Sequence, residues 1–129
     1  MITLDTCSII WNALSPEKLS EKARKAIREN EKNLIFCEIS LWKIAMLMEK
    51  ERLKVEVSYQ KLIDLIFSAY DFELKGITPE IAKLAVSFPT EISQDPADRI
   101  IAATSILEKA TLVTADKNLI KAKRVPTIW

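Results

Sequence analysis

The sequence predicts an α/β fold, a three-layer α/β/α arrangement in which helices cover both faces of a short, mostly parallel sheet. Short apolar runs follow one another along the chain, and longer segments with apolar residues at helical spacing separate them. No linker or internal repeat divides the 129 residues, and this length is enough to bury a core. We therefore expect a single domain over residues 1–129.

The first half of the chain predicts two strands and three helices. Each predicted helix follows a serine, because serine is a favoured N-cap, and apolar residues recur three or four positions apart behind it. A strand over residues 1–6 ends on Asp5, and residues 6–8 turn the chain. The remaining elements are a strand over residues 33–37 and helices that begin after Ser15, Ser40 and Ser58.

The second half continues the alternation of strands and helices. Thr78 and Pro79 predict the start of a helix that runs to Val86, since proline suits the first helical position. A loop then leads to another helix, which begins at Pro96. Strands are expected over residues 72–77, 111–114 and 126–128, with one helical turn over residues 118–121.

The helix that begins at Pro96 is unusually apolar and carries a carboxylate on its inner face. Asp95 is a good N-cap for it. Asp98 falls at the third helical position, where a carboxylate can reach back to the cap, yet it also shares a face with Ile101. A carboxylate on a buried face needs a partner, because burying an unpaired charge is costly. Two interpretations of Asp98 therefore stay open, a capping box and a ligand that faces a metal ion.

Composition excludes several classes of function. The chain has no histidine, which removes Ser-His-Asp triads, Cys-His pairs and histidine-bound zinc. Gly76 is the only glycine, so the glycine-rich dinucleotide and P-loop motifs are absent. The net charge of +1 creates no global field that attracts nucleic acid, so any site for a polyanion has to be local.

The sequence also predicts a cytoplasmic protein without membrane contact. Its apolar runs are shorter than the roughly 20 residues that a membrane-spanning helix needs. No basic and apolar leader precedes the first predicted strand. Cys7 and Cys37 lie in apolar stretches and form no CxxC pair, so we expect two buried free thiols.

Three aspartates are expected to meet at one edge of the sheet. Asp5 ends the first strand, Asp116 follows the strand over residues 111–114, and Asp98 begins the helix that leads into that strand. Ligand sites in open parallel sheets lie beyond the carboxyl ends of the strands. Clustered carboxylates suit Mg²⁺ or Mn²⁺, which would activate water for phosphodiester cleavage. Each aspartate also has a simpler interpretation, because Asp5 and Asp116 could cap the turns that follow them.

Five segments spread over the whole chain form a familiar pattern: Leu4–Cys7, Ile39–Trp42, Asp95–Thr104, Leu112–Asp116 and Thr127–Trp129. Together they resemble a PIN domain and, within that fold, the VapC-type toxins of toxin–antitoxin pairs. The resemblance implies a Mg²⁺-dependent ribonuclease that forms a homodimer. It also implies a cognate antitoxin that inserts into an acidic pocket and holds the enzyme inactive.

The resemblance assigns roles to individual residues. Asp5, Asp98 and Asp116 match the acidic site, so the resemblance implies that they are catalytic and bind the metal ion. Arg99 lies next to Asp98 in the sequence and is expected to pair with site carboxylates or with a substrate phosphate. Thr6, directly after Asp5, is a further candidate for binding substrate.

One position departs from the pattern of this family. The pattern places a glutamate after Ser-Leu-Trp, and this chain has Lys43 there. A cation among metal ligands repels Mg²⁺ and pairs with an aspartate, which would reduce or abolish activity. Lys43 could instead hold a substrate phosphate or point to solvent. Glu38 is a candidate for the missing catalytic carboxylate, and Ser93-Gln94 stand where the pattern usually has a histidine.

Two alternative functions stay open. A PIN-fold module that binds RNA or an antitoxin but cleaves poorly would follow from Lys43. A phospho-acceptor domain fits less well, because Cys7 stands where a haloacid-dehalogenase-type phosphatase needs an aspartate and Thr78 where a receiver needs one. Trp42 is expected in the core, and the apolar stretch over residues 42–53 is expected to be covered in part by a second copy or an antitoxin helix.

Overall fold

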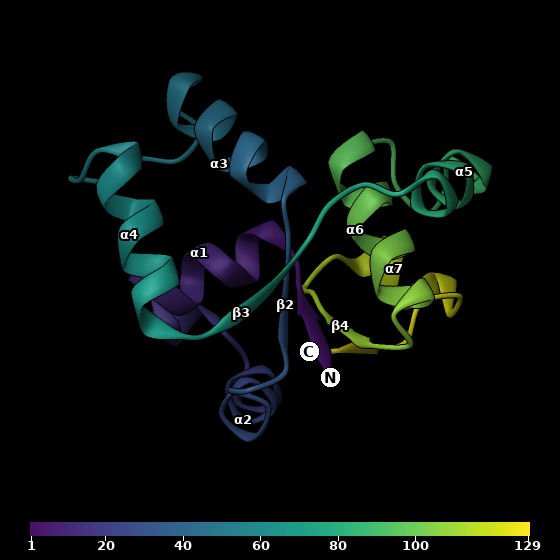
Figure 1. The fold of residues 1–129 in the computed structure, drawn as a ribbon, viewed down its shortest axis with the longest axis horizontal. Helices are drawn as coiled ribbons and strands as arrows, with labels where there is room; N and C mark the ends of the chain where they lie inside the picture. Colours follow the sequence, from purple (N-terminus) through teal and green to yellow (C-terminus); the bar gives the residue numbers. More distant parts are fainter.

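The computed structural model describes residues 1–129 and contains one five-stranded sheet between two layers of helices (Figure 1). Every strand pair is parallel, and the order across the sheet is β3-β2-β1-β4-β5. This confirms the predicted α/β fold. The strands are β1 (Ile2–Leu4), β2 (Leu34–Cys37), β3 (Phe72–Lys75), β4 (Thr111–Val113) and β5 (Thr127–Ile128).

Helices α1 to α4 lie on one side of the sheet and α5 to α7 on the other (Figure 1). Alternate residues of β2 face the two layers, as the two-residue period of a strand requires, with Phe36 in the first core and Ile35 in the second. The helical elements are α1 (Thr6–Leu14), the 3₁₀ turn η1 (Pro16–Lys18), α2 (Glu21–Glu29), α3 (Ile39–Glu49), α4 (Tyr59–Ala69), α5 (Pro79–Ser87), α6 (Pro96–Leu107) and α7 (Lys117–Ala122).

The predicted start of the chain is wrong in two respects. Residues 6–8 open helix α1 rather than a turn, because the Asp5 carboxylate caps that helix. The helix predicted after Ser15 is only the short η1, and α2 begins after Ser20, whose hydroxyl accepts the amide hydrogen of Ala23. Leu19 adopts an extended backbone between them and buries its side chain in the core.

Other local predictions have mixed outcomes. The caps at Ser58, Thr78 and Asp95 are confirmed. Ser40 is not a cap, because α3 begins one residue earlier, after Glu38. Two predictions of burial are also wrong: Cys7 is an exposed free thiol, and the Trp42 side chain on α3 is exposed, so only Cys37 is a buried thiol.

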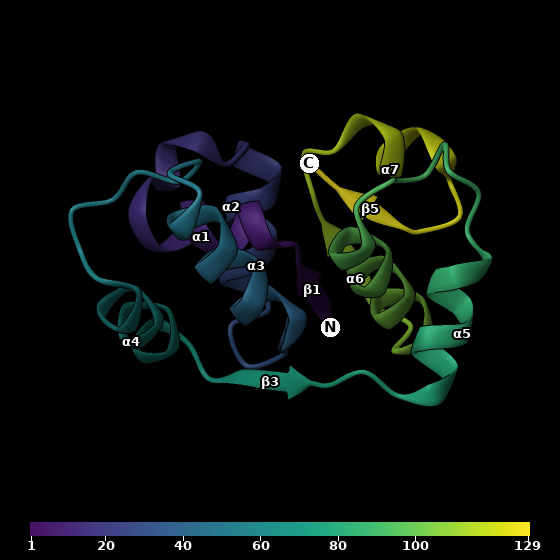
Figure 2. The same cartoon turned by 90° about the horizontal axis from the view of Figure 1, so that it is seen from above.

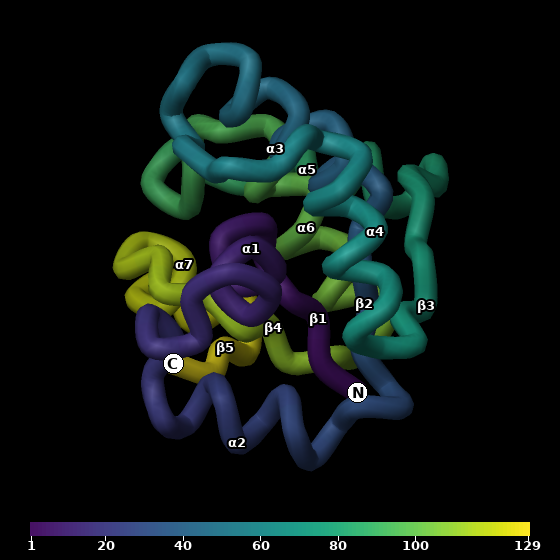
Figure 3. Tube along the Cα trace, turned by 90° about the vertical axis from the view of Figure 1, so that its left-hand side faces the viewer, coloured from purple at the N-terminus to yellow at the C-terminus, as the bar shows by residue number.

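Helix α3 lies at one end of the molecule and α2 at the opposite end (Figure 3). Strand β3 forms the outer edge of the sheet, beside α4 (Figure 2). No helix in this structure has the length and hydropathy that crossing a membrane would require.

Candidate active site

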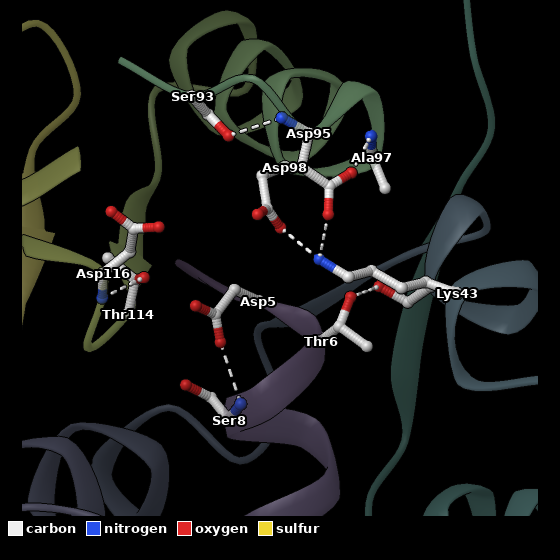
Figure 4. Close-up of polar contacts among 11 residues, drawn as sticks. Asp5, Thr6, Ser8, Lys43, Ser93, Asp95, Ala97, Asp98, Thr114 and Asp116 are labelled. Atoms are coloured by element: carbon white, nitrogen blue, oxygen red, sulfur yellow. Dashed lines mark hydrogen bonds and ion pairs between the residues drawn. The ribbon is translucent and has the colours of Figure 1, made fainter. Parts of the chain in front are cut away.

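The carboxyl edge of the sheet brings together the three aspartates that the sequence singles out (Figure 4). Asp5 joins β1 to α1, and Asp116 joins β4 to α7. These two strands are neighbours, and the strand order reverses between them, since β2 and β3 continue on the other side of β1. Asp98 in the first turn of α6 faces the same space (Figure 4). A parallel sheet therefore places its switch point, the usual position of a ligand site, at these side chains.

Two of the three aspartates cap helices. The Asp5 Oδ1 atom accepts the amide hydrogen of Ser8 at 2.8 Å. The Asp116 Oδ1 atom accepts the amide hydrogens of Asn118 and Leu119 at 2.8 and 3.1 Å. The simpler interpretation of both residues as caps is confirmed.

Asp98 forms no capping box. The amide of Asp95, which a capping box would satisfy, donates to Ser93 Oγ at 3.1 Å instead, while Asp95 itself caps α6 through the amide of Ala97 at 2.8 Å. The Asp98 Oδ1 atom accepts a hydrogen bond from Lys43 Nζ at 2.8 Å. Asp98 is therefore turned toward α3, and its interaction lies across the site.

Lys43 reaches from α3 to the start of α6 and pairs with two carboxylates (Figure 4). Its Nζ atom lies 2.7 Å from Asp95 Oδ2 and 2.8 Å from Asp98 Oδ1, and the side chain is 11% exposed. Burial acts to lower the pKa of the Lys43 ammonium, but hydrogen bonds and charge from the two aspartates outweigh it and hold the pKa above its usual value. The interpretation of Lys43 as a solvent-facing residue is wrong.

Burial and the charge of Lys43 act in opposite directions on the pKa values of the carboxylates. Burial raises the pKa of Asp98 despite the opposing effect of Lys43, and the charges of Asp95 and Asp5 add to the rise. It also raises the pKa of Asp5, with hydrogen bonds from Thr114 and Ser8 opposing. Burial acts in the same direction on Asp95, but here Lys43 prevails and the net pKa is lowered, because this side chain is 38% exposed against 20% for Asp98.

Two other candidate residues lie outside the group of carboxylates. Glu38 is exposed, and its Oε2 atom lies 3.0 Å from where a Cβ atom on Gly76 would stand, so it packs against the backbone after β3. Thr6 is buried, and its hydroxyl lies 3.0 Å from Ser40 Oγ, which links α1 to α3 beneath Lys43. The structure does not bring Glu38 to the aspartates, and it turns the Thr6 hydroxyl away from open space.

Arg99 also points away from the aspartates, although it neighbours Asp98 in the sequence. Its guanidinium donates to backbone carbonyls at the end of α5 and in the loop that follows. Nε lies 3.0 Å from the carbonyl of Ala85, and Nη1 lies 2.9 Å from that of Ser93. The remaining acceptors are the carbonyls of Val86, Phe88 and Pro89. Arg99 therefore holds the loop that leads into α6.

The donor set in this conformation does not fit a divalent metal ion. No group of three or more carboxylate or thiolate residues is gathered closely enough to hold one. The ammonium of Lys43 already contacts Asp98, where a metal ion would compete with it for the same oxygen. The ammonium of Lys43 thus stands at the position where the family resemblance implied an acidic residue.

Sequence reasoning missed the role of Asp95 as a partner of Lys43. The three-residue spacing of Asp95 and Asp98 puts both carboxylates near the start of α6, which is a usable signal for a cation between them. Nothing local indicated that this cation comes from Lys43, because 55 residues separate it from Asp98. The hydroxyls of Ser40 and Ser93, which support Thr6 and Asp95, were likewise not predicted as part of the site.

Comparisons with known proteins agree with this fold. The PIN domain family model matches residues 2–125. Ribonuclease VapC22 of Mycobacterium tuberculosis is 34% identical over 131 residues, which cover 99% of this chain and 98% of that protein. This chain therefore belongs to the PIN domain family and is related to its VapC-type members.

Solved structures show the same fold at lower sequence identity. The structure of DNA-bound VapBC from Salmonella typhimurium aligns with a TM-score of 0.72 and 15% identity, covering 98% of this chain and 95% of that one. The structure of VapBC2 from Rickettsia felis bound to a promoter DNA fragment aligns with a TM-score of 0.67 and 20% identity, covering 98% and 97%.

Proposed function

We propose that this protein is a ribonuclease toxin of a toxin–antitoxin pair, which hydrolyses RNA phosphodiester bonds at the carboxyl edge of its sheet. The observation that carries the proposal is the convergence of Asp5, Asp98 and Asp116 at the switch point of the sheet (Figure 4). The relative of 34% identity that is named a ribonuclease supports the same activity.

Metal dependence is part of the proposal, with a condition that Lys43 imposes. The family resemblance implies oxygen ligands from Asp5, Asp98 and Asp116 for Mg²⁺ or Mn²⁺, and these side chains would have to come closer together than they lie in this structure. In the described conformation Lys43 holds Asp98, so the ammonium and the metal ion compete for the same carboxylate. We therefore expect weaker metal binding and lower activity than in a PIN domain with a glutamate at this position.

The Lys43 ion pairs favour a second candidate function. Lys43 lies 2.7 and 2.8 Å from two carboxylates, so its single positive charge offsets part of their negative charge without a metal ion. A protein in this state would bind RNA or an antitoxin and cleave poorly. This alternative differs from the first only in catalysis, so a cleavage assay separates them.

The assay measures cleavage of a mixed RNA pool by purified protein with Mg²⁺, with Mn²⁺ and with EDTA. Cleavage by the wild type that Asp98→Asn abolishes supports the enzyme. Cleavage that begins only with Lys43→Glu supports the binding module. Lys50→Glu is the matched control, because this exposed residue ends the same helix and the substitution changes the net charge equally. Absence of cleavage in the wild type and in Lys43→Glu would contradict the proposed ribonuclease site.

Protein partners follow from the same proposal. The structural relatives include toxin–antitoxin complexes, such as one from Klebsiella pneumoniae with a TM-score of 0.62 and 19% identity over 96% of this chain and 93% of that one. The side chain of Trp42, on the helix that carries Lys43, is exposed and offers apolar surface to a partner. We propose a cognate antitoxin and a second copy of this chain as partners, which co-expression and light scattering would test.

A further inference from the structure

A cavity of about 710 Å³ lies near the start of α6, and six of its eight lining residues are polar or charged. One wall is the loop between α5 and α6, and the other is one side of α7, which run next to each other in Figure 2. Its volume falls within the range of roughly 300–1,000 Å³ that small-molecule sites occupy. The lining consists of Thr90, Glu91, Ile92, Ser93, Gln94, Asn118, Lys121 and Ala122.

Both walls of the cavity continue directly into the acidic site. Gln94 immediately precedes Asp95, and Asn118 comes two residues after Asp116. The lining therefore begins within two residues of Asp95 and Asp116 along the chain, although neither aspartate lines the cavity. A linear substrate with its reacting group at the carboxylates would place its neighbouring unit here.

The lining matches the chemistry of a nucleotide. The side-chain amides of Gln94 and Asn118 can each donate and accept hydrogen bonds, as the Watson–Crick edges of unpaired bases require. The Glu91 carboxylate adds an acceptor that suits the amino group of a base. Lys121 supplies a positive charge for a backbone phosphate, and Lys117 lies one helical turn before it on the same side of α7.

The positive charge on this part of the chain is local, and Glu91 is the one acid in the cavity lining. Residues 117–124 contain four cations and no acid, in a chain whose net charge is only +1. Arg124 lies over the ring of Phe88, 5.0 Å from its centroid. No ion pair in the structure involves Lys117, Lys121 or Lys123. These lysines are therefore available to a polyanion.

We infer that this cavity binds the nucleotide next to the scissile phosphate of a single-stranded RNA. Gln94 and Asn118 contact its base, and Lys121 and Lys117 contact the phosphates on either side. This inference rests on the proposed cleavage of RNA at the neighbouring carboxylates. The inference goes further by stating where the RNA lies relative to the carboxylates and which residues select its sequence.

Binding of a labelled RNA without cleavage tests the inference. The probe is a fluorescein-labelled single-stranded RNA of about 12 nucleotides, and its anisotropy is followed in EDTA at several salt concentrations. Lys121→Ala should weaken binding about fivefold and reduce the slope of log K against log salt by about 0.7, the value for one phosphate contact on a single strand. Lys22→Ala, an exposed lysine on α2, is the matched control and should leave binding unchanged.

Sequence preference and crosslinking complete the test. Asn118→Ala should reduce the difference in affinity between RNAs of different sequence, and a 4-thiouridine probe should crosslink to residues 90–94 or 118–122. If the wild type binds and cleaves RNA, and Lys121→Ala and Asn118→Ala have the same affinity and sequence preference as the wild type, this inference is overturned. The proposed function would still stand. Absence of both binding and cleavage in the wild type would overturn the proposed function itself. If Lys121→Ala lost binding to an acidic antitoxin peptide and kept its binding to RNA, the inference would also be overturned.

Discussion

Replacing Lys43 with methionine tests whether the lysine is the resident cation of the acidic site. The substitution keeps a long side chain in place and removes the ammonium from Asp95 and Asp98. With an effective dielectric constant of about 20, each ion pair at this distance represents roughly 6 kcal/mol of gross attraction. Desolvation of the three groups offsets most of that energy, and solvent screens the pair with Asp95, whose side chain is 38% exposed.

The expected net loss of stability is about 2–3 kcal/mol, below the roughly 3–5 kcal/mol measured for fully buried pairs that lose one partner. For a chain of this length, such a loss lowers the Tm by about 6–10 °C. Thermal unfolding at neutral pH in EDTA, followed by circular dichroism, measures it. Lys50→Met on the same helix is the control, and its Tm should match that of the wild type because Lys50 is exposed.

Adding Mg²⁺ gives the second half of the test. In Lys43→Met the carboxylates lack the lysine counter-charge, so Mg²⁺ should bind and raise the Tm. At a hundredfold excess of Mg²⁺ over its Kd, the free energy of unfolding should rise by about 2.7 kcal/mol. The wild type should respond much less, because its ammonium competes for Asp98. An equal response of both proteins to Mg²⁺, or a Lys43→Met variant as stable as the wild type in EDTA, would refute the resident-cation interpretation.

Three further predictions concern the packing and reactivity around the site. Thr3→Val removes a buried hydroxyl that has no hydrogen-bond partner and keeps the shape of the side chain. We expect the free energy of unfolding in urea to rise by about 1 kcal/mol, and no rise would argue against an unsatisfied hydroxyl. Arg99→Lys should lower the free energy of unfolding by about 2 kcal/mol in the same assay, because an ammonium cannot replace the planar guanidinium that donates to five carbonyls. An unchanged urea midpoint would contradict that role. Neighbouring protein atoms desolvate the Cys7 thiol in part and raise its pKa to about 11, although the residue as a whole is exposed, and burial raises the pKa of Cys37 to about 12. A disulfide reagent should therefore modify the exposed Cys7 slowly at neutral pH, with a rate that rises about tenfold for each unit increase in pH up to the pKa, and should modify Cys37 only after unfolding. Rapid labelling at neutral pH would contradict the raised pKa values.

Local chemistry accounts for the elements that the sequence predicted well. The caps at Ser58, Thr78 and Asp95 each bond an amide two or three residues ahead, so their partners lie within the same short segment. The alternation of apolar strands with helices likewise fixes a parallel sheet, and a parallel sheet places Asp5 and Asp116 at one edge. Prediction failed between Ser15 and Ser20, where two good caps compete and the burial of Leu19 decides which one starts a long helix.

The charge state of the site, in contrast, depends on contacts between distant segments. From the sequence, Lys43 could point to solvent, hold a phosphate or pair with an aspartate, and the packing of α3 against the start of α6 selects the pairing with Asp95 and Asp98. Arg99 is adjacent to Asp98 in the chain, yet the carbonyls at the end of α5 capture it. A sequence specifies which ionisable groups are available, but only the folded arrangement of helices determines which of them come within hydrogen-bonding distance.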